Sequence, residues 1–197
     1  MRNLVIILDP AHGSDVAGKS SPDGTHKEYM WSRNICNSLA KQLEDLDFRV
    51  EFTNTSELEI GLSKRKQIAN NIKIEPNQSK LLLTLHNNAA GMGNNWCNAR
   101  GYEVFTSWGN TNTTKSNVFG KILVDNLKSS FPTYKYRGLK ESNFTVLMGD
   151  YYALYIEWLF QDNKEDVRLL KNDLVNDRLV VTLVKAIVEM DNINNQS

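Results

Sequence analysis

Short apolar runs alternate along this chain with longer segments whose apolar residues recur at helical spacing. Residues 3–8 contain the run Leu4-Val5-Ile6-Ile7-Leu8, and residues 80–85 are almost as apolar. Uninterrupted runs of this length are typical of strands that are buried on both faces. Between them, residues 29–46 carry apolar side chains at roughly helical intervals. The alternation predicts an α/β fold with a largely parallel sheet.

The same patterns place the remaining elements. Further strands are expected at residues 48–53, 101–106 and 153–157, and a short extended piece at residues 145–147. Helices are expected at residues 64–72, 118–127, 167–170 and 179–190, with Ser63 as the N-cap of the first of these. At 197 residues, the chain has the size of one globular domain. We therefore expect a single domain over residues 1–191, followed by a polar C-terminal tail over residues 192–197.

The charge balance narrows the range of partners. Lys and Arg together number 23, Asp and Glu also number 23, and the formal net charge is therefore 0. A neutral chain has no general attraction to nucleic acid or to an anionic membrane, so we expect no nucleic-acid partner. No apolar run approaches the roughly 20 residues that span a bilayer, so we also expect no membrane insertion.

The N-terminal apolar run is too short for a secretion signal. Asp9-Pro10 follows Leu8 directly, whereas a signal peptide has about 7–15 apolar residues before its cleavage site. With no signal peptide visible, we expect synthesis in the cytoplasm. Cys36 and Cys97 cannot form a disulfide framework and are not spaced as a metal clip, so two reduced thiols are expected.

Residues with catalytic chemistry follow or end three of the expected strands. The first strand leads into Asp9-Pro10-Ala11-His12-Gly13, and the strand at residues 80–85 leads into His86-Asn87-Asn88. The strand at residues 153–157 ends at Glu157. In open α/β sheets, ligands bind outside the carboxyl ends of the strands. We therefore expect the functional site at this edge of the sheet.

His12 and His86 are candidate metal ligands. A single strand-end histidine is commonly a structural hydrogen-bonding residue, but two at matching strand ends favour a metal site. A catalytic zinc takes three protein ligands and keeps one position open. Glu28 would complete a His₂Glu set, although Thr25-x-x-Glu28 also matches a capping box at a helix start. His26 is the spare candidate, and we interpret it as an exposed loop residue.

Glu157 follows an apolar run and is flanked by aromatic residues. A carboxylate in such surroundings is unfavourable unless it is paired. One interpretation is a salt bridge with Arg100 or Arg137. The interpretation that we favour is a carboxylate beside the reacting water, whose burial raises its pKa and suits it to general acid–base catalysis.

Four segments together resemble the zinc-dependent N-acetylmuramoyl-L-alanine amidases, in the catalytic-domain type of autolysins and phage endolysins. They are Leu8-Asp9-Pro10-Ala11-His12-Gly13, the helix beginning near Glu28, Leu83-Thr84-Leu85-His86-Asn87-Asn88-Ala89, and the Glu157 strand with the following Asn163-Lys164-Glu165-Asp166. Supporting pieces lie within residues 62–70, 100–105 and 139–144. All seven occur in the family's order and together cover nearly the whole chain.

The resemblance implies a six-stranded, mostly parallel sheet with helices on both faces, and one catalytic zinc ion. It implies peptidoglycan as the substrate, cleaved at the amide between the lactyl group of N-acetylmuramic acid and L-alanine. Carried over by position, His12, Glu28 and His86 would be the zinc ligands. Glu157 would be the catalytic carboxylate, which takes a proton from water and delivers it to the departing alanine nitrogen. Asn88 matches a family position that we expect to contact the substrate, and we expect a monomer.

The chain departs from the family pattern near Glu157. Tyr152 stands where the family often has Pro, and Leu159 stands where it often has Gly, two residues after the catalytic Glu. Because glycine is conformationally permissive, Leu159 removes a flexible position, and we expect different substrate contacts there.

The tryptophans have two expected roles. The loop at residues 91–99 has no matched counterpart in the family, and its Trp96 is a candidate platform for stacking a glycan. Trp31, Trp108 and the tyrosines are expected to be packing residues.

Two other functions are alternatives to the amidase. The first is a carboxypeptidase-like zinc hydrolase that acts on cell-wall peptides. Such enzymes typically have a ligand His and Glu close in sequence, whereas here Glu28 follows His12 by 16 residues. The second is a non-catalytic peptidoglycan-binding module, which has no need for Glu157. For the amidase itself, we expect a lysis enzyme of the phage or prophage type, or else a cell-wall hydrolase. Such an enzyme accumulates in the cell and acts on the cell wall after release.

Overall fold

Six strands form one sheet in the order β2-β1-β3-β6-β4-β5. The computed structural model describes residues 2–91 and 95–195. The strands are β1 (Leu4–Pro10), β2 (Val50–Phe52), β3 (Ser79–Asn88), β4 (Tyr102–Ser107), β5 (Tyr136–Ser142) and β6 (Tyr152–Phe160). Every neighbouring pair is parallel except β4 and β6, which are antiparallel. The predicted α/β class with a mostly parallel six-stranded sheet is confirmed.

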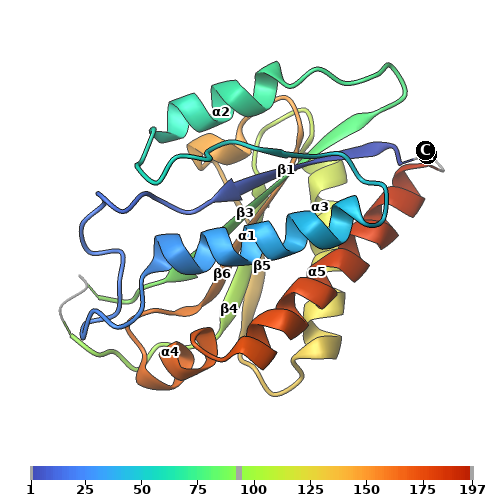
Figure 1. The fold of residues 1–197 in the computed structure, drawn as a ribbon. Coiled ribbons are helices and arrows are strands. Elements are labelled where there is room, and N and C mark those ends of the chain that lie inside the picture. The colour runs from blue at the N-terminus through green and yellow to red at the C-terminus, as the bar shows by residue number, and fades with distance from the viewer. Residues whose placement is uncertain (1, 92–94, 196–197) are drawn as a thin grey trace.

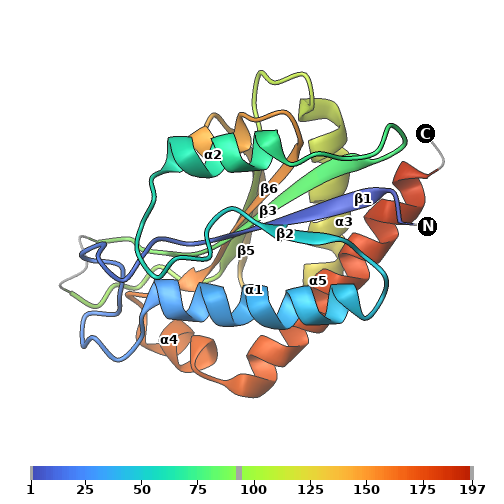
Figure 2. The same cartoon turned by 45° about the horizontal axis from the view of Figure 1, so that its top comes forward.

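Helices cover both faces of the sheet (Figure 1). They are α1 (Glu28–Glu44), α2 (Leu62–Asn71), α3 (Thr113–Ser130), α4 (Lys164–Leu170) and α5 (Asp173–Asn194), with a short 3-10 helix, η1 (Thr145–Leu147). Residues of α1, α3 and α5 pack into a large core on one face, whereas α2 and η1 pack into a smaller apolar cluster on the other. Figure 2 shows α2 and α1 on opposite sides of the strands.

Burial on both faces explains the composition of the central strands. Side chains alternate along a strand, so Leu4, Ile6 and Leu8 enter the large core while Ile7 enters the smaller cluster. Each position of β1 is therefore buried, and the strand is apolar up to Asp9.

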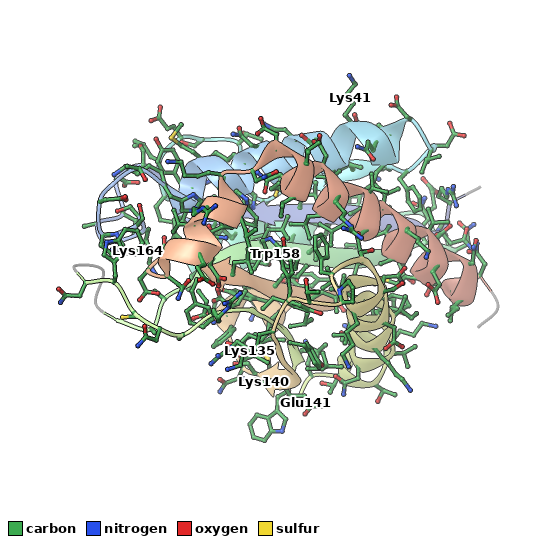
Figure 3. The ribbon with its side chains drawn as sticks, turned by 90° about the horizontal axis from the view of Figure 1, so that it is seen from below. Lys41, Lys135, Lys140, Glu141, Trp158 and Lys164 are labelled. Atoms are coloured by element: carbon green, nitrogen blue, oxygen red, sulfur yellow. The ribbon has the colours of Figure 1, made fainter. Side chains whose placement is uncertain are left out.

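Aromatic residues fill the large core beneath α5. Trp158 of β6 is fully buried, and its ring centroid lies 4.8 Å from that of Phe131 and 5.2 Å from that of Tyr102 (Figure 3). Trp31 is buried as expected, with Nε1 donating to Asn176 Oδ1 at 3.0 Å. The expectation for Trp108 was wrong, because this side chain follows the last residue of β4 and is 60% exposed.

The sixth strand is not the one that the sequence pattern predicts. The strand is β5, a half-buried edge strand, whereas residues 145–147 were expected to be extended and instead form η1. Val146 and Leu147 of η1 are buried in the smaller cluster together with Ala69 of α2. Their apolar character thus comes from packing of a helical turn and not from a strand.

Helix boundaries differ from the expected ones mainly at the N-termini. The helices α3 and α5 begin five and six residues earlier than expected. The first turn of α3 is polar, and the first turn of α5 exposes Leu174, so neither turn continues the buried helical spacing. The N-cap of α2 is Gly61 and not Ser63, which lies inside the helix. At the other end of the chain, α5 continues to Asn194, within the segment expected as a tail. Residues 196 and 197 of that tail lie outside the described residues.

None of the helices within residues 2–91 and 95–195 has the length and apolar character that crossing a membrane requires. The two cysteines are free thiols, with Cys36 buried and Cys97 half-buried.

Candidate metal centre and active site

The carboxyl ends of β1, β3 and β6 lie side by side because these strands are parallel neighbours. His12 follows the end of β1 by two residues, and His86 lies near the end of β3. Glu157 lies in β6, directly opposite His86 in the strand register. Glu28 does not lie in the sheet but is the first residue of the helix α1. The sheet and one helix thus bring together all four residues predicted for the reaction centre.

His12, Glu28 and His86 form a compact cluster whose potential ligand atoms all lie within 4.8 Å of one another. Glu28 Oε1 is 3.0 Å from His86 Nδ1 and 3.4 Å from His12 Nε2. The two imidazole rings meet edge to face, with centroids 4.8 Å apart. In a tetrahedral zinc site with ligands at about 2.0–2.1 Å, two ligand atoms are about 3.3 Å apart. The spacing of this cluster therefore fits one small metal ion.

Glu28 is fully buried and still favours its ionised form. Burial by itself would raise the pKa of this carboxyl, but the contacts with His12 and His86 outweigh burial and hold the pKa well below its usual range. A buried carboxylate is stable only with compensating hydrogen bonds or positive charge. The donor set thus has the charge and the chemistry that a bound cation requires.

Two neighbours hold the Glu28 carboxylate in a fixed orientation. The backbone N–H of Asn87 donates to Oε1 at 3.0 Å, and Gln161 Nε2 donates to Oε2 at 3.0 Å. Thr25 does not cap α1, since the N-cap is Lys27 and no side chain caps the helix. The capping-box interpretation of Glu28 is therefore wrong, and its carboxylate points into the cluster.

His26 was expected to be exposed, and this prediction is wrong. The side chain is 4% exposed, and its Nε2 lies 2.7 Å from Asn87 Oδ1. Burial lowers the pKa of His26 and so favours the neutral ring. Asn87 also donates from Nδ2 to the carbonyl of Trp158 at 2.8 Å. His26 therefore supports Asn87, whose backbone N–H binds Glu28.

The backbone at His12 is strained and is held by two arginines. Its φ is +48°, a left-handed conformation that is uncommon for a residue with a side chain. Arg33 and Arg65 donate to the His12 carbonyl at 2.9 and 3.1 Å, and Arg33 also donates to the Ala11 carbonyl at 3.0 Å. Such strain persists where surrounding contacts determine the conformation.

Arg65 is itself anchored by a buried ion pair. Its guanidinium lies 2.9 Å from Asp9 Oδ1 and 2.9 Å from Glu59 Oε2, and its side chain is 2% exposed. Asp9 accepts further hydrogen bonds from Thr53 and Thr84. The segment from Asp9 to His12 is thus tied to α2, to β3 and to the residue that follows β2, and these contacts hold His12 in place.

Glu157 is half-buried, and its Oε2 is a buried oxygen without a hydrogen-bond partner among the described residues. Burial, followed by the nearby negative charge of Glu28, raises its pKa to about 8. Neither arginine suggested as a partner pairs with it. Arg100 pairs with Glu165 at 2.5 Å, and Arg137 lies 3.6 Å from Glu103. Glu157 is therefore available for proton transfer.

Asn88 lies at the edge of this site in a polar network centred on Glu103. Its Nδ2 donates to Glu103 Oε1 at 2.8 Å, while Lys140 pairs with Glu103 Oε2 at 2.5 Å. In the register of the sheet, Glu103 of β4 stands opposite Glu157 of β6. Asn88 thus connects the end of β3 to the strand on the far side of Glu157.

An irregularity in β6 lies directly after Glu157. His86 pairs with Glu157 and Asn88 pairs with Phe160, so β6 has one residue more than β3 over this stretch. Leu159 adopts φ +61° there while remaining 1% exposed. This left-handed conformation explains why glycine suits the position, and the chain places a leucine in it at the cost of strain.

Several residues around the centre were missed by sequence reasoning. Gln161, Asn87 and His26 support Glu28, and Arg33 and Arg65 support His12. Arg65 carries a weak signal, since it is a cation within a resembling segment. Gln161 and Asn87 carry none, because their partners are fixed only by the fold.

Residues 6–189 match the sequence profile of a family described as N-acetylmuramoyl-L-alanine amidase. This match spans far more than half of the 197 residues. No curated protein sequence matches the chain.

Solved structures of similar fold agree with this match. An N-acetylmuramoyl-L-alanine amidase from Clostridium difficile 630 has a TM-score of 0.83 at 24% identity, covering 96% of this chain and 97% of that one. The CwlD amidase from Clostridioides difficile, in complex with the GerS lipoprotein, has a TM-score of 0.82 at 19% identity, covering 96% and 98%. The catalytic domain of the CD27L endolysin targeting Clostridia difficile has a TM-score of 0.68 at 19% identity, covering 93% and 96%. At these identities the likeness establishes a common fold.

Proposed function

The chain belongs to the N-acetylmuramoyl-L-alanine amidase family, and from this premise we propose that it hydrolyses peptidoglycan with one zinc ion held by His12, Glu28 and His86. The bond cleaved is the amide between N-acetylmuramic acid and L-alanine. The observation that carries the proposal is the meeting of these three side chains, from three separate elements, within 4.8 Å. Two imidazoles and a carboxylate form an established catalytic zinc set.

When bound, zinc supplies a Lewis acid that polarises the scissile carbonyl and makes a water molecule more acidic. The chain's contribution is to hold the ligands in advance. Gln161 fixes the Glu28 carboxylate, Arg65 fixes the His12 backbone, and the ring of Tyr155 stacks on that of His86 with centroids 4.6 Å apart. Such supporting contacts orient metal ligands and tune their basicity.

Glu157 is the proposed proton carrier. Its unpartnered Oε2 can accept a proton from the attacking water and then donate it to the alanine nitrogen as the amide breaks. Burial raises the pKa of Glu157, which suits a group that must both take up and release a proton near neutral pH. Its position opposite His86 places it beside the ligand cluster.

Asn88 is the proposed substrate-contacting residue. Asn88 Nδ2 uses one hydrogen to bind Glu103 and has a second hydrogen that can bind a substrate. Its Oδ1 accepts from the Ala89 N–H at 2.8 Å. The side chain is therefore held in one orientation at the edge of the site, with limited remaining capacity to bind a substrate carbonyl.

The testing experiment is a digest of purified sacculi with the metal-loaded and the chelator-treated protein, followed by mass spectrometry of the released fragments. The expected products are intact stem peptides that begin with a free L-alanine amine, lost on chelation and restored by zinc. Release of single terminal amino acids would instead indicate a carboxypeptidase. Binding to sacculi without new free amines would indicate a wall-binding module, and either result would overturn the proposal.

The biological setting is part of the same proposal. We place the enzyme among lysis enzymes of the phage or prophage type, made as a monomer in the cytoplasm and acting on the cell wall after release. The support is the likeness of the fold to an endolysin catalytic domain. Expression in a host bacterium tests it: lysis should begin only when a membrane-permeabilising protein is co-expressed. Lysis without that protein would contradict this setting, and sedimentation equilibrium would test the monomer.

A further inference from the structure

A pocket of about 850 Å³ lies beside α4, outside the ligand cluster. We call it the Trp96 pocket. Its lining includes Thr25 before α1, Trp96, and residues of α4 and the turn after it, among them Lys164, Arg168 and Lys171. Pockets of roughly 300–1,000 Å³ suit small-molecule ligands, so this one has room for a disaccharide-sized group.

The Trp96 pocket is positively charged on a chain whose net charge is 0. Its lining carries four cations and two carboxylates, and both carboxylates are already engaged. Glu165 pairs with Arg100 at 2.5 Å, and Asp23 accepts from the Ser21 hydroxyl at 2.6 Å and the Thr25 hydroxyl at 3.0 Å. Burial opposes the ionised form of Asp23 only weakly, and these hydrogen bonds lower its pKa.

Three cations of the pocket are left for a ligand. Arg168 and Lys171 are exposed, and neither has a carboxylate within 4.0 Å among residues 2–91 and 95–195. Lys164 projects from the start of α4, with Nζ 5.7 Å from the centroid of the Trp96 ring (Figure 3). The pocket therefore combines one aromatic ring with several cations.

The backbone next to Trp96 is anchored by hydrogen bonds. The next residue, Cys97, donates its N–H to the Asp162 carbonyl at 2.7 Å, and its own carbonyl accepts from Asn163 Nδ2 at 3.0 Å. Asn163 is also the N-cap of α4, where its side chain accepts from the N–H groups of Glu165 and Asp166. Trp96 is thus attached to the helix that carries the cations.

Two residues that line the pocket are close in sequence to residues of the reaction centre. Thr25 lies three residues before Glu28, and Lys164 lies three residues after Gln161, which binds Glu28. A ligand in the Trp96 pocket is therefore positioned relative to the metal ligands by the same backbone. This arrangement suits a group that is part of the substrate but is not itself cleaved.

We propose that the Trp96 pocket binds the N-acetylmuramic acid–peptide unit of peptidoglycan, with a sugar ring against Trp96 and a free peptide carboxylate against Arg168 and Lys171. The inference rests on the proposed function and adds to it a second binding region. An indole ring is a large flat surface with an apolar body, which suits the apolar face of a pyranose. A guanidinium and an ammonium group bind carboxylates through charge-assisted hydrogen bonds.

The first test measures binding with the uncleaving Glu157→Gln variant, loaded with zinc, and a soluble disaccharide–tetrapeptide fragment. In calorimetry, Trp96→Ala and the pair Arg168→Glu/Lys171→Glu should each weaken binding about tenfold. The Glu157→Gln protein should bind a fragment with amidated carboxylates about tenfold more weakly than the unmodified fragment. Adding Arg168→Glu/Lys171→Glu to that protein should change its affinity for the amidated fragment little. Lys41→Glu/Lys121→Glu is the charge-matched control, since Lys41 is exposed on α1, Lys121 is exposed on α3 and neither residue lines the pocket. Lys41 lies well apart from Lys164 in Figure 3.

The second test separates this inference from the proposed function. In the active protein, the same pocket variants should raise KM for solubilised peptidoglycan about tenfold while kcat stays unchanged, as expected when a contact serves ground state and transition state equally. If the parent enzyme cleaves sacculi and the variants keep its KM, the inference fails and the function stands. If a glycerol-phosphate polymer binds the pocket more tightly than the fragment, the ligand class proposed here is wrong. If the parent protein cleaves nothing, the proposed function itself fails.

Discussion

Gln161 and Glu28 are joined by a hydrogen bond of 3.0 Å between two buried side chains that lie 133 residues apart in the sequence. Gln161 Nε2 binds Oε2 of the carboxylate, and Oε1 is the oxygen that lies close to both histidines. The glutamine therefore sets which oxygen of Glu28 faces the proposed metal position. It acts as a positioning residue, since it does not touch the metal position itself.

Replacing Gln161 with Leu should weaken zinc binding about 10- to 100-fold, the usual cost of losing a contact behind a metal ligand. Among residues 2–91 and 95–195, Gln161 is the only side-chain donor to this carboxylate apart from the histidines, and the substitution removes it. Competition with a chromophoric chelator measures the dissociation constant directly. Gln67→Leu is the matched control, because Gln67 is exposed on α2. Equal zinc affinity in the Gln161→Leu and Gln67→Leu variants would show that the hydrogen bond does not position the ligand.

Replacing Glu157 with Gln should lower turnover by about 100- to 10,000-fold, the range for loss of a general acid–base group. Zinc binding should be kept, because Glu157 is not among the three clustered ligands. Turnover on sacculi and the zinc content of the purified variant are the two measurements. A variant that still turns over rapidly would remove Glu157 from the mechanism.

The same substitution should change how the stability of the metal-free protein depends on pH. Glu157 has its pKa raised to about 8 in the folded state, so the folded state holds its proton more tightly than the unfolded state does. The contribution of Glu157 to the free energy of unfolding is fully present below the unfolded-state pKa of about 4.5. This contribution is lost as the pH rises to about 8. A shift of this size is equivalent to at most about 5 kcal/mol, and partial exposure reduces the expected effect to about 2 kcal/mol.

Denaturant unfolding at pH 5 and at pH 8.5 checks this pH dependence. As the pH rises from 5 to 8.5, the free energy of unfolding of metal-free Glu157→Gln should increase by about 2 kcal/mol relative to that of the metal-free parent protein. Exposed Glu44→Gln serves as the control and should show no such gain. A constant difference between parent and Glu157→Gln at both pH values would contradict the raised pKa.

Replacing Arg65 with Met should destabilise the fold by about 3–5 kcal/mol, because it leaves Asp9 buried without its ion-pair partner. The double variant Arg65→Met/Asp9→Asn should recover part of this loss. Arg49→Met is the comparison, since the Arg49–Glu51 pair is exposed and should contribute less than about 1 kcal/mol. Urea unfolding measures all three. If Arg65→Met costs no more than Arg49→Met, the buried pair does not hold the segment that leads to His12.

At Leu159, glycine should be tolerated better than alanine, by about 1 kcal/mol. Both substitutions remove the same kind of buried side chain, but only glycine is unstrained at φ +61°. Leu154, buried in the regular part of β6, is the control, and there glycine should be about 1 kcal/mol worse than alanine. Thermal unfolding of the four variants gives both comparisons. The same order at the two sites would mean that Leu159 is not strained.

The sequence predicted those elements in which buried apolar side chains recur at the regular spacing of a strand or a helix. The runs in β1 and β3 are buried nearly throughout, so their composition alone identifies them. The strand β5 is half-exposed at the sheet edge, and its residues mix charges with Gly138. No apolar pattern marks such a strand, whereas the apolar residues of η1 imitate one.

In the candidate site too, residues with a local sequence signal could be predicted, and residues whose role depends on distant contacts could not. His12, His86 and Glu157 could be found because each stands at the end of a recognisable strand. The burial of His26 could not, because it depends on Asn87, which lies 61 residues away in sequence. Local spacing also left open a capping pair of Thr25 and Glu28, which the structure excludes, because spacing contains no information on what α1 faces in the folded chain.

The extra residue in β6 has a consequence for how this strand can be altered. Between Glu157 and Phe160 the strand gains one residue over β3, and after this step Gln161 reaches Glu28 beneath the sheet edge. One continuous segment therefore supplies both the proton carrier and the group that steers a metal ligand, on two different sides. Deleting residue 159 would keep every reactive side chain, yet it would remove the extra residue between Glu157 and Phe160 and shift Gln161 relative to Glu28. The length of this segment is thus as much a determinant of the chemistry as the identity of its residues.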